Sequence, residues 1–378
     1  MAQLELTIFQ VSLQRFQRVM FIMGMLPYSN HCSSKLGMSC RKGFMLSLHF
    51  LAVFFFTGFL IKDQIKYVNE AIYNVSDVFS SVIHRLGFST LILVQLIIHL
   101  ESTYKSNMYT EIFNKFEQMR KLLLRKFGIQ FDLSNLKFCV YILQIHFTLY
   151  CGLLLMLVIT TAIQPTPVVR LLISLHAELV LKVKLFEFMC FIIVFMVMIC
   201  HVCRAAKQHC RQLEATRFES SFQRRECLLG FIALQDLHAL LWENMQQLTD
   251  YFEWSLPGLF AKQLIDLTLL AYWAVLNLET GTSIVIRYYL IVFWFMKIST
   301  LTIACFLCSI CERKDRELRS YFRTCLKDRQ NLLLMRCMHR ISMQLWQETI
   351  TFVAGSFVTI NIETLGKVSN FIVERKLV

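Results

Sequence analysis

The residues that could do chemistry in this chain are ionisable side chains inside long apolar segments. Six of them fall in two such segments: Glu178, Lys182, Lys184 and Glu187 in residues 176–201, and Lys262 and Asp266 in residues 257–280. Each costs roughly 2.5–3.5 kcal/mol in a membrane helix on insertion scales, so each needs a partner or a cavity. Glu178 and Lys182, Lys184 and Glu187, and Lys262 and Asp266 are three or four residues apart, so the two members of each pair can lie on one helix face and neutralise each other. The alternative is that these side chains line a pocket. For Lys262, near a predicted helix end, extension of the ammonium group to the interface is a further explanation.

Sequence motifs of soluble enzymes are missing from the chain. It contains no HExxH, GxSxG, GxGxxG or P-loop sequence. Cysteine and histidine residues gather at two places: Cys200, His201, Cys203, His209 and Cys210, and then Cys305, Cys308 and Cys311. Zinc binding is one interpretation, but packed thiols or palmitoylation beside a membrane fit the spacing better. We therefore expect no enzymatic activity, no cofactor and no metal ion.

The composition indicates which elements must position these side chains. Hydrophobic residues make up 56% of the 378 residues and charged residues 17%, and the mean hydropathy is +0.52. These values are typical of a polytopic membrane protein that interacts with the lipid bilayer. Only 4 prolines and 12 glycines occur, which favours long helices over a β-barrel and predicts an all-α fold. The net charge of +13 fits basic cytoplasmic loops, so nucleic acid is not an expected partner.

Seven segments are long and apolar enough to be transmembrane helices, for which about 20 residues are needed. They are residues 43–61, 78–100, 138–161, 176–201, 257–280, 284–310 and 350–373. Lysine and arginine gather in alternate connections, which predicts a cytoplasmic N-terminus and, after seven spans, an extracellular C-terminus. The sequon that begins at Asn74 falls in a predicted external loop, where it predicts glycosylation.

The cytoplasmic connections carry apolar residues at helical spacing. One series is Ile112, Phe116, Met119, Leu123 and Phe127, which ends at Gly128, and a second is Leu234, Leu237, Leu241, Met245, Leu248 and Phe252; a third is Leu318, Phe322, Cys325, Leu334, Met338, Ile341 and Leu345. Such stripes predict amphipathic helices that form a domain below the membrane or contact sister subunits, or else lie flat on the lipid surface.

These patterns predict four regions. They are a cytoplasmic N-terminal segment (1–42), a six-helix transmembrane bundle (43–310) with helical cytoplasmic loops (101–137 and 202–256), cytoplasmic anchor helices (311–349), and a seventh helix with a short external tail (350–378).

On this topology, aromatic and polar side chains collect in the outer half of the bundle. They are His84, Arg85, Tyr150, Glu178, Lys182, Tyr272, Trp273, Asn277, Arg287, Tyr288, Tyr289 and Trp294. Aromatic residues near an interface are often only a membrane belt. A cavity lined by aromatic side chains with a few polar groups is, however, what a small organic ligand requires. We predict a ligand site that is open to the outside.

The chain resembles the insect gustatory receptors of the fly type, within the insect chemoreceptor superfamily. The resemblance covers the whole length, with seven spans, short outer loops and helical inner loops. Near the end of the chain, Gly355, Phe357, Ile360 and Asn361 match the apolar part of the family pattern. The Thr-Tyr-x5-Gln-Phe signature that follows in the family is replaced here by Ser369, Asn370, Lys376 and Leu377.

This resemblance implies a ligand-gated, non-selective cation channel in the plasma membrane of chemosensory neurons. Four identical or related subunits would surround a pore lined by the seventh helix, and the ligand would be a small-molecule tastant or a contact pheromone. Thr359, Asn361, Ser369 and Asn370 are then candidate pore residues, because neutral polar groups allow weak ion binding and release. Interhelical hydrogen bonds are the other explanation of these four polar side chains.

Two other classes of seven-helix protein are alternatives. A G-protein-coupled receptor would have the opposite orientation, an Asp-Arg-Tyr after the third span and an Asn-Pro-x-x-Tyr in the seventh, and the chain has none of these. A transporter would show inverted repeats and helices broken near the midplane, and neither is visible.

Overall fold

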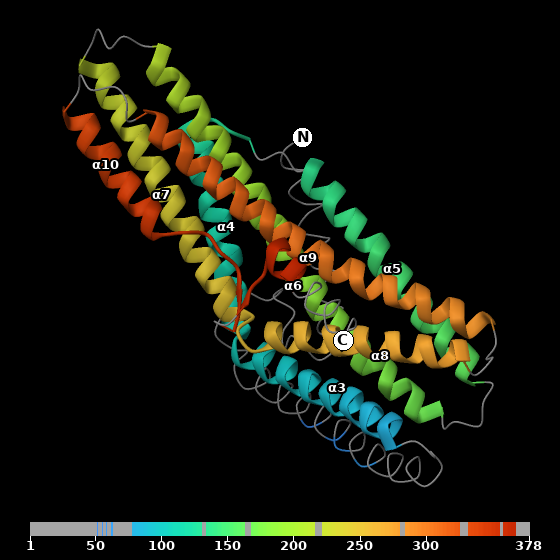
Figure 1. Ribbon diagram of the computed structural model, residues 1–378. Coiled ribbons are helices and arrows are strands. Elements are labelled where there is room, and N and C mark those ends of the chain that lie inside the picture. Colours follow the sequence, from blue (N-terminus) through green and yellow to red (C-terminus); the bar gives the residue numbers. More distant parts are fainter. Residues whose placement is uncertain are drawn as a thin grey trace. The chain divides into compact units, whose positions relative to one another are not determined.

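The computed structural model describes residues 78–130, 134–162, 168–215, 221–279, 284–325, 332–355 and 358–367, together with Leu51, Phe55, Gly58 and Lys62. The elements in these residues are the helices α3 (Val78–Tyr104), α4 (Ser106–Phe127), α5 (Ser134–Ala162), α6 (Val168–Ala215), α7 (Ser221–Tyr251), α8 (Ser255–Glu279), α9 (Ile284–Cys325) and α10 (Leu332–Gln347), and the strands β1 (Val353–Ala354) and β2 (Val358–Thr359) (Figure 1). The predicted all-α character is confirmed, with one two-stranded sheet in the described part of the chain.

Five helices are long and apolar enough to cross a membrane. Their apolar stretches are Arg85–Tyr104, Leu136–Met156, Leu175–Gln212, Ser255–Val275 and Arg287–Arg323. They confirm the second to sixth predicted spans by length and composition. The first predicted span, residues 43–61, and the glycosylation sequon at Asn74 lie outside the described residues apart from a few isolated positions in the span. Helices α6 and α9 have 48 and 42 residues, because the helical pattern of each span continues into the following polar segment.

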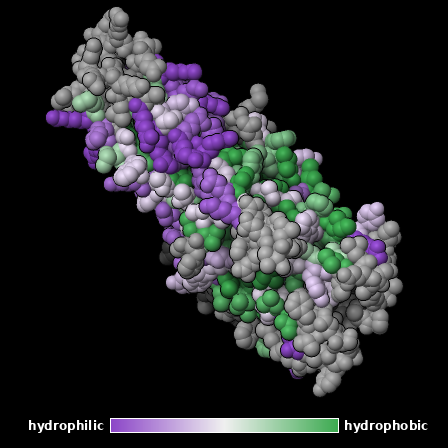
Figure 2. Space-filling model, in the orientation of Figure 1, coloured by the Kyte–Doolittle hydropathy of each residue, from purple (hydrophilic) through white to green (hydrophobic). Residues whose placement is uncertain are grey.

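The chain divides into two compact units that alternate along the sequence. Unit 1 comprises Met1–Ser106, Leu143–Glu187 and Trp254–Leu301, and unit 2 comprises Asn107–Ile142, Phe188–Glu253 and Thr302–Val378. Helices α5, α6 and α9 therefore contribute residues to both units. In Figure 2 the hydrophilic side chains gather over the part of unit 2 that contains α7 and α10, whereas hydrophobic side chains dominate the coloured surface of unit 1.

In unit 1, α3 packs against α8 at close range. A Cβ atom at Gly258 would lie 3.3 Å from Cγ2 of Val94, so glycine allows a close approach here and a larger residue would require Val94 to shift. The buried Glu101 carboxylate accepts hydrogen bonds from the backbone N–H groups of Trp254 (2.7 Å) and Ser255 (3.1 Å). Because these N–H groups lie at the start of α8, Glu101 caps that helix and fixes it to the end of α3.

Unit 2 confirms the predicted amphipathic helices. In α4 the apolar stripe from Ile112 to Leu123 is buried, and the helix ends at Phe127, directly before Gly128, whose φ of 63° suits a residue without a side chain. In α7 the stripe from Leu234 to Leu248 is also buried. Aromatic side chains join α4 to α6, since the ring centroids of Tyr109 and Phe191 are 5.5 Å apart in an edge-to-face arrangement.

The predicted seventh helix, residues 350–373, needs a correction at its start. Instead of helix, β1 and β2 pair antiparallel, with Val353 opposite Thr359, and the next helical turn begins at Ile362. The β-branched residues in this stretch favour extended backbone, and Gly355 supplies a φ of 56° between the strands. An apolar count over the whole segment does not distinguish these extended residues from helix.

Candidate functional site

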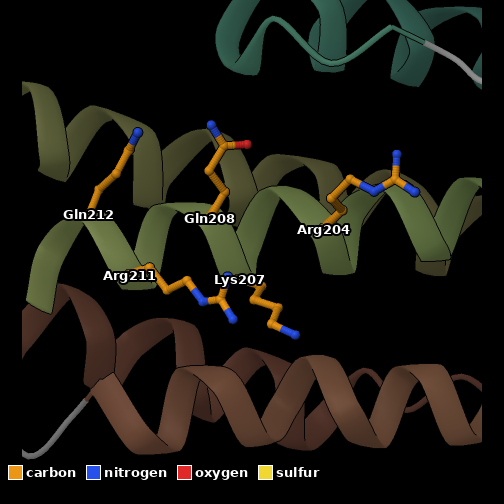
Figure 3. A pocket seen from close by; sticks show the side chains of 5 residues that line it. All are labelled: Arg204, Lys207, Gln208, Arg211 and Gln212. Carbon is orange, nitrogen blue, oxygen red and sulfur yellow. The ribbon is translucent and has the colours of Figure 1, made fainter.

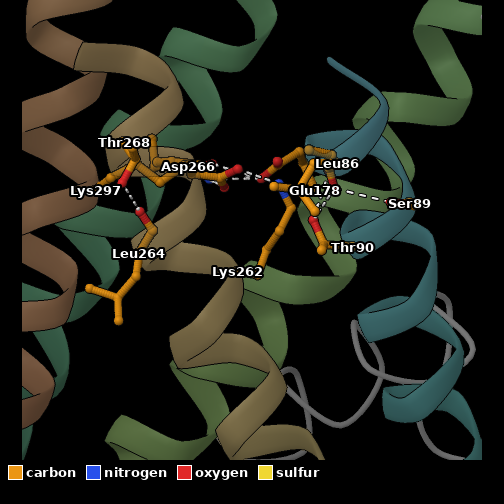
Figure 4. Close-up of polar contacts among 11 residues, drawn as sticks. Leu86, Ser89, Thr90, Glu178, Lys262, Leu264, Asp266, Thr268 and Lys297 are labelled. Atoms are coloured by element: carbon orange, nitrogen blue, oxygen red, sulfur yellow. Dashed lines mark hydrogen bonds and ion pairs between the residues drawn. The ribbon is translucent and has the colours of Figure 1, made fainter. Parts of the chain in front are cut away.

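A network of buried charges connects α6, α8 and α9 inside unit 1. The Lys297 ammonium on α9 lies 3.1 Å from the Glu178 carboxylate on α6 and 2.8 Å from the Asp266 carboxylate on α8. Asp266 also forms an ion pair with Lys262, one turn earlier on α8. In Figure 4 the side chains of Glu178 and Asp266 point toward one another with the lysines beside them. Each carboxylate is thus neutralised by a lysine of a different helix or of the next turn.

A tyrosine extends the network toward α5. The Tyr150 hydroxyl donates a hydrogen bond to Glu178 (3.2 Å), and the ammonium group of Lys182 lies 4.1 Å from the centre of the Tyr150 ring. Lys182 donates its own hydrogen bond to the Thr300 hydroxyl of α9 (3.2 Å). Lys182 is therefore held by a π face and a neutral oxygen, and the network contains three lysines for two carboxylates.

The cost of these charges explains why they occur together. An isolated charge inside a low-dielectric environment is costly, whereas paired and hydrogen-bonded charges offset much of that cost. Since Lys297 is 2% exposed, its position is stable only while both carboxylates face it. The network therefore fixes the register of α6, α8 and α9 against one another.

An aromatic wall lies beside the network. The rings of Tyr150 and Phe293 stack at 5.4 Å, and those of Tyr289 and Phe293 stack at 5.7 Å. Leu154 completes this cluster. The Tyr289 hydroxyl and the Arg287 Nε atom are buried without a hydrogen-bond partner in the described part of the chain. Apolar rings beside the unsatisfied Tyr289 hydroxyl are the kind of lining that a small organic ligand with an acceptor oxygen requires.

The β1–β2 hairpin is anchored by a second polar cluster, in unit 2. The buried carboxylate of Asp315 on α9 accepts a hydrogen bond from the backbone N–H of Ile350 (3.4 Å) and pairs with Arg319. His238 on α7 lies between two carboxylates, 3.4 Å from Asp315 and 3.5 Å from Glu348. The backbone that leaves α10 is therefore fixed to α7 and α9 immediately before β1.

The other end of the hairpin is fixed by the hydroxyl group of Ser309 and the side-chain amide of Asn361. Ser309 on α9 accepts a hydrogen bond from the backbone N–H of Ile362 (3.0 Å). The Asn361 side chain accepts a hydrogen bond from the backbone N–H of Thr364 (2.9 Å). Asn361 is therefore the N-cap of the helical turn that begins at Ile362.

Comparison with known proteins identifies the family. A family model described as "7tm Chemosensory receptor" matches residues 13–374. This chain belongs to the chemosensory receptor family. A Drosophila melanogaster relative of this receptor, described as "Putative gustatory receptor 98a", is 27% identical over 369 residues, which cover 97% of this chain and 90% of the relative.

The fold of this chemosensory receptor is also similar to solved structures. The insect olfactory receptor OR5 from Machilis hrabei matches with a TM-score of 0.68 at 11% identity, over 98% of this chain and 97% of that one. The same protein in complex with eugenol matches with a TM-score of 0.63 at 13% identity, over 97% and 96% of the two chains. At these identities the likeness shows the fold, and the receptor is a multi-pass membrane protein with the olfactory receptor's architecture.

Several predicted ligand-site residues of the receptor lie together in unit 1. Tyr150, Glu178 and Lys182 belong to the charge network. Tyr272 and Trp273 are partly buried on α8, with ring centroids 5.6 Å apart, and Trp294 is partly buried on α9. Arg85 is exposed on α3. His84 and Asn277 lie in α3 and α8, but their side chains are outside the described residues.

The predicted pairings on the membrane helices are partly corrected. Lys184 and Glu187 do form an ion pair at 2.9 Å. Glu178 instead pairs with Lys297, because the α9 ammonium approaches it from a neighbouring helix. Lys262 pairs with Asp266 as its spacing suggests, but it is buried in the protein, so extension to the interface is not its explanation.

The sequence interpretation missed Lys297, which joins two carboxylates. It is the only charged residue between Arg287 and Glu312, and that isolation is the signal that could have identified it.

The predicted pore residues are only partly placed. Thr359 is exposed at the end of β2 and shares a hydrogen bond with Thr364 at 3.2 Å. Asn361 has the capping role given above. Ser369 and Asn370 lie outside the described residues.

The cysteines of this receptor in α6 and α9 behave as packed thiols. Cys203 donates a hydrogen bond to the backbone oxygen of Lys314 (3.3 Å), and Cys311 donates one to that of Ile192 (3.9 Å). Cys305 and Cys308 are buried. Among the residues that the structure describes, no group of three histidine, cysteine or acidic side chains could hold a metal ion.

Proposed function

We propose that this receptor is a gustatory chemoreceptor in the plasma membrane of chemosensory neurons. It acts as a subunit of a ligand-gated, non-selective cation channel, formed by four identical or related chains. Its ligand is a small external molecule, a tastant or a contact pheromone. The observation that carries this proposal is the full-length likeness to an olfactory receptor whose complex with the small molecule eugenol has been solved, together with a relative described as a gustatory receptor.

We assign ligand sensing to unit 1 and the gate to the segment after α10. The aromatic wall and the Tyr289 hydroxyl are groups of the kind that a small organic ligand contacts, and they support this assignment. Helix α9 contributes Lys297 to unit 1 and Asp315 to unit 2. A change in the α9 position on ligand binding would therefore act on the hairpin through the same helix that carries the binding residues.

Electrical recording tests this proposal. Cells that express the receptor, alone and with related receptors, are exposed to a chemical panel, and currents are measured in whole cells and in excised patches without GTP. We expect ligand-evoked cation currents that persist in the excised patches. Currents that require GTP, or coupled uptake of a solute without such currents, would reject the channel.

Substitution of the ligand-site residues gives the second arm. The triple change Trp273→Ala, Arg287→Gln and Trp294→Ala is expected to shift the concentration for half-maximal response at least tenfold. Lys121→Gln, an exposed residue of α4, serves as the control. Equal responses of both variants, at equal surface expression, would remove these residues from the ligand site.

A further inference from the structure

A basic pocket lies on the exposed face of the second half of α6. It is lined by Arg204, Lys207, Gln208, Arg211 and Gln212 and has a volume of about 450 Å³ (Figure 3). These positions follow helical spacings of three and four residues and form two adjacent rows on the helix surface: in Figure 3, Arg204, Gln208 and Gln212 point to one side, and Lys207 and Arg211 to the other.

The three cations of the basic pocket form no ion pair within 4.0 Å with the carboxylates that the structure describes. Arg204, Lys207 and Arg211 are all exposed. The acidic residue of α9 that faces Lys207 is Glu317. Its carboxylate is already held by the Lys314 ammonium (2.6 Å) and the Tyr321 hydroxyl (2.6 Å). The pocket therefore presents a local excess of positive charge to its surroundings.

The basic pocket directly follows an apolar stretch of the same helix. Helix α6 has no acidic residue from Phe188 to Leu213, and its first basic residue after Lys184 is Arg204. At about 1.5 Å per residue, Arg204 and Arg211 are separated by about 10 Å along the helix axis. Cations at this place extend over the depth of a lipid headgroup layer beside a membrane helix. On the buried face of the same helix, the thiols of Cys203 and Cys210 donate hydrogen bonds to backbone oxygens of α9, so the basic residues lie outside this face and are exposed.

We propose that the basic pocket binds the multiply phosphorylated headgroup of an anionic phospholipid of the cytoplasmic leaflet. The arginine guanidinium groups pair with phosphate oxygens, Lys207 adds a third charge, and Gln208 offers an amide donor to the hydroxyl groups of the headgroup. A ligand with several closely spaced negative charges matches three exposed cations that have no ion-pair partner among the described carboxylates. The orientation predicted from loop charge puts this end of α6 on the cytoplasmic side, where anionic lipids are enriched. This binding does not depend on ligand-gated conduction.

Lipid titration of the purified full-length receptor tests the proposal. The probe is dioctanoyl phosphatidylinositol bisphosphate, and its affinity in detergent is measured by microscale thermophoresis. The variant Arg204→Gln, Lys207→Gln and Arg211→Gln is expected to bind on the order of a hundredfold more weakly, since each cation near a lipid surface contributes about a factor of five to ten. The variant Arg204→Lys with Arg211→Lys keeps the charge and is expected to retain most of the affinity.

A matched control removes three exposed cations elsewhere. Lys121→Gln, Arg125→Gln and Lys126→Gln on α4 change the net charge equally and are expected to leave lipid affinity unchanged. Equal weakening by the α4 variant, or equal affinity for dioctanoyl phosphatidylserine, would reduce the effect to nonspecific charge and overturn the proposal. Equal affinity for free inositol trisphosphate would assign the pocket to a soluble phosphate and also overturn it. Unchanged binding by the α6 glutamine variant would remove the site altogether.

Discussion

The ammonium group of Lys297 lies 2.8 Å from the carboxylate of Asp266, and this contact joins α9 to α8 among apolar residues of unit 1. Both side chains are buried, and each has a second partner of opposite charge. The contact is therefore part of a larger charge network and not a single pair. The stability of the group depends on all its members being present.

Removal of Lys297 should destabilise the receptor strongly. Lys297→Met leaves Glu178 without its ion-pair partner, and breaking a buried pair typically costs about 3–5 kcal/mol. We expect a clear fall in the melting temperature of the purified protein in detergent. The double variant Lys297→Met with Glu178→Gln should recover part of that loss, because no unpaired carboxylate remains at Glu178. A single variant that melts with the wild type would show that the network contributes nothing to stability.

Loss of the Asp315 carboxylate should loosen the hairpin. Asp315→Asn weakens the contacts with Arg319 and His238, and a buried group that loses its partners costs about 1–3 kcal/mol. Hydrogen exchange of residues 350–360, followed by mass spectrometry, should become on the order of tenfold to a hundredfold faster. Asp236→Asn removes an exposed acid of α7 and should leave this exchange unchanged. Equal exchange in both variants would show that Asp315 does not anchor the hairpin.

Alanine should have opposite effects at two glycines. Gly355 has a φ of 56°, where an L-residue costs about 1–2 kcal/mol, so Gly355→Ala should lower stability. Gly152 lies inside α5 with open space around it, so Gly152→Ala should raise stability by about 0.5–1 kcal/mol. Asparagine tolerates the left-handed region better, and Gly355→Asn should lie between Gly355→Ala and wild type. Melting temperatures measured in the same detergent compare the three; a stabilised Gly355→Ala would contradict the observed turn.

Two substitutions at Asn361 separate its capping role from its predicted pore role. Asn361→Ala removes the cap and should cost about 1 kcal/mol of stability. Asn361→Asp keeps an acceptor for the Thr364 N–H group and adds a negative charge at the position that we assign to the pore. We expect Asn361→Asp to keep the cap but to lose part of the stability, because the Asn361 amide also donates to the Glu312 carboxylate, and to change the relative permeability of cations, measured from reversal potentials. Unchanged permeability in a conducting receptor would leave Asn361 with the capping role alone.

The elements that could be predicted from sequence are those governed by a simple pattern. Apolar runs of sufficient length gave the membrane helices α3, α5, α6, α8 and α9, because burial of apolar groups in lipid needs only composition. The stripes in α4 and α7 gave the amphipathic helices, since a helical period places Phe116 or Leu241 on one buried face. The N-terminal span could not be compared, because most of it lies outside the described residues.

The features that could not be predicted depend on contacts between distant segments. Glu178 has a lysine four residues away, yet it pairs with Lys297 of another helix. Sequence spacing identifies only neighbours on the same helix, so it predicted Lys182 as the partner of Glu178 instead of Lys297. The β1–β2 hairpin was hidden for a similar reason: its apolar residues are compatible with helix, and its extended form is stabilised by Asp315 and Ser309 of α9. The N-cap role of Asn361 was missed for the same reason, because the prediction of a continuous helix hid the start of a new helical turn at Ile362.

The separation of Glu178 from Lys297 has a consequence for biosynthesis. The two residues are 119 positions apart in sequence. At about 5–20 residues per second, Lys297 is synthesised roughly 6–24 s after Glu178. During this interval the Glu178 carboxylate has no α9 partner, because Lys297 has not yet been synthesised. The nascent α6 must therefore be held by the insertion machinery, or its carboxylate must stay hydrated. Cells that express this receptor must protect α6 for that time, and yield should respond to the speed of translation between the two residues.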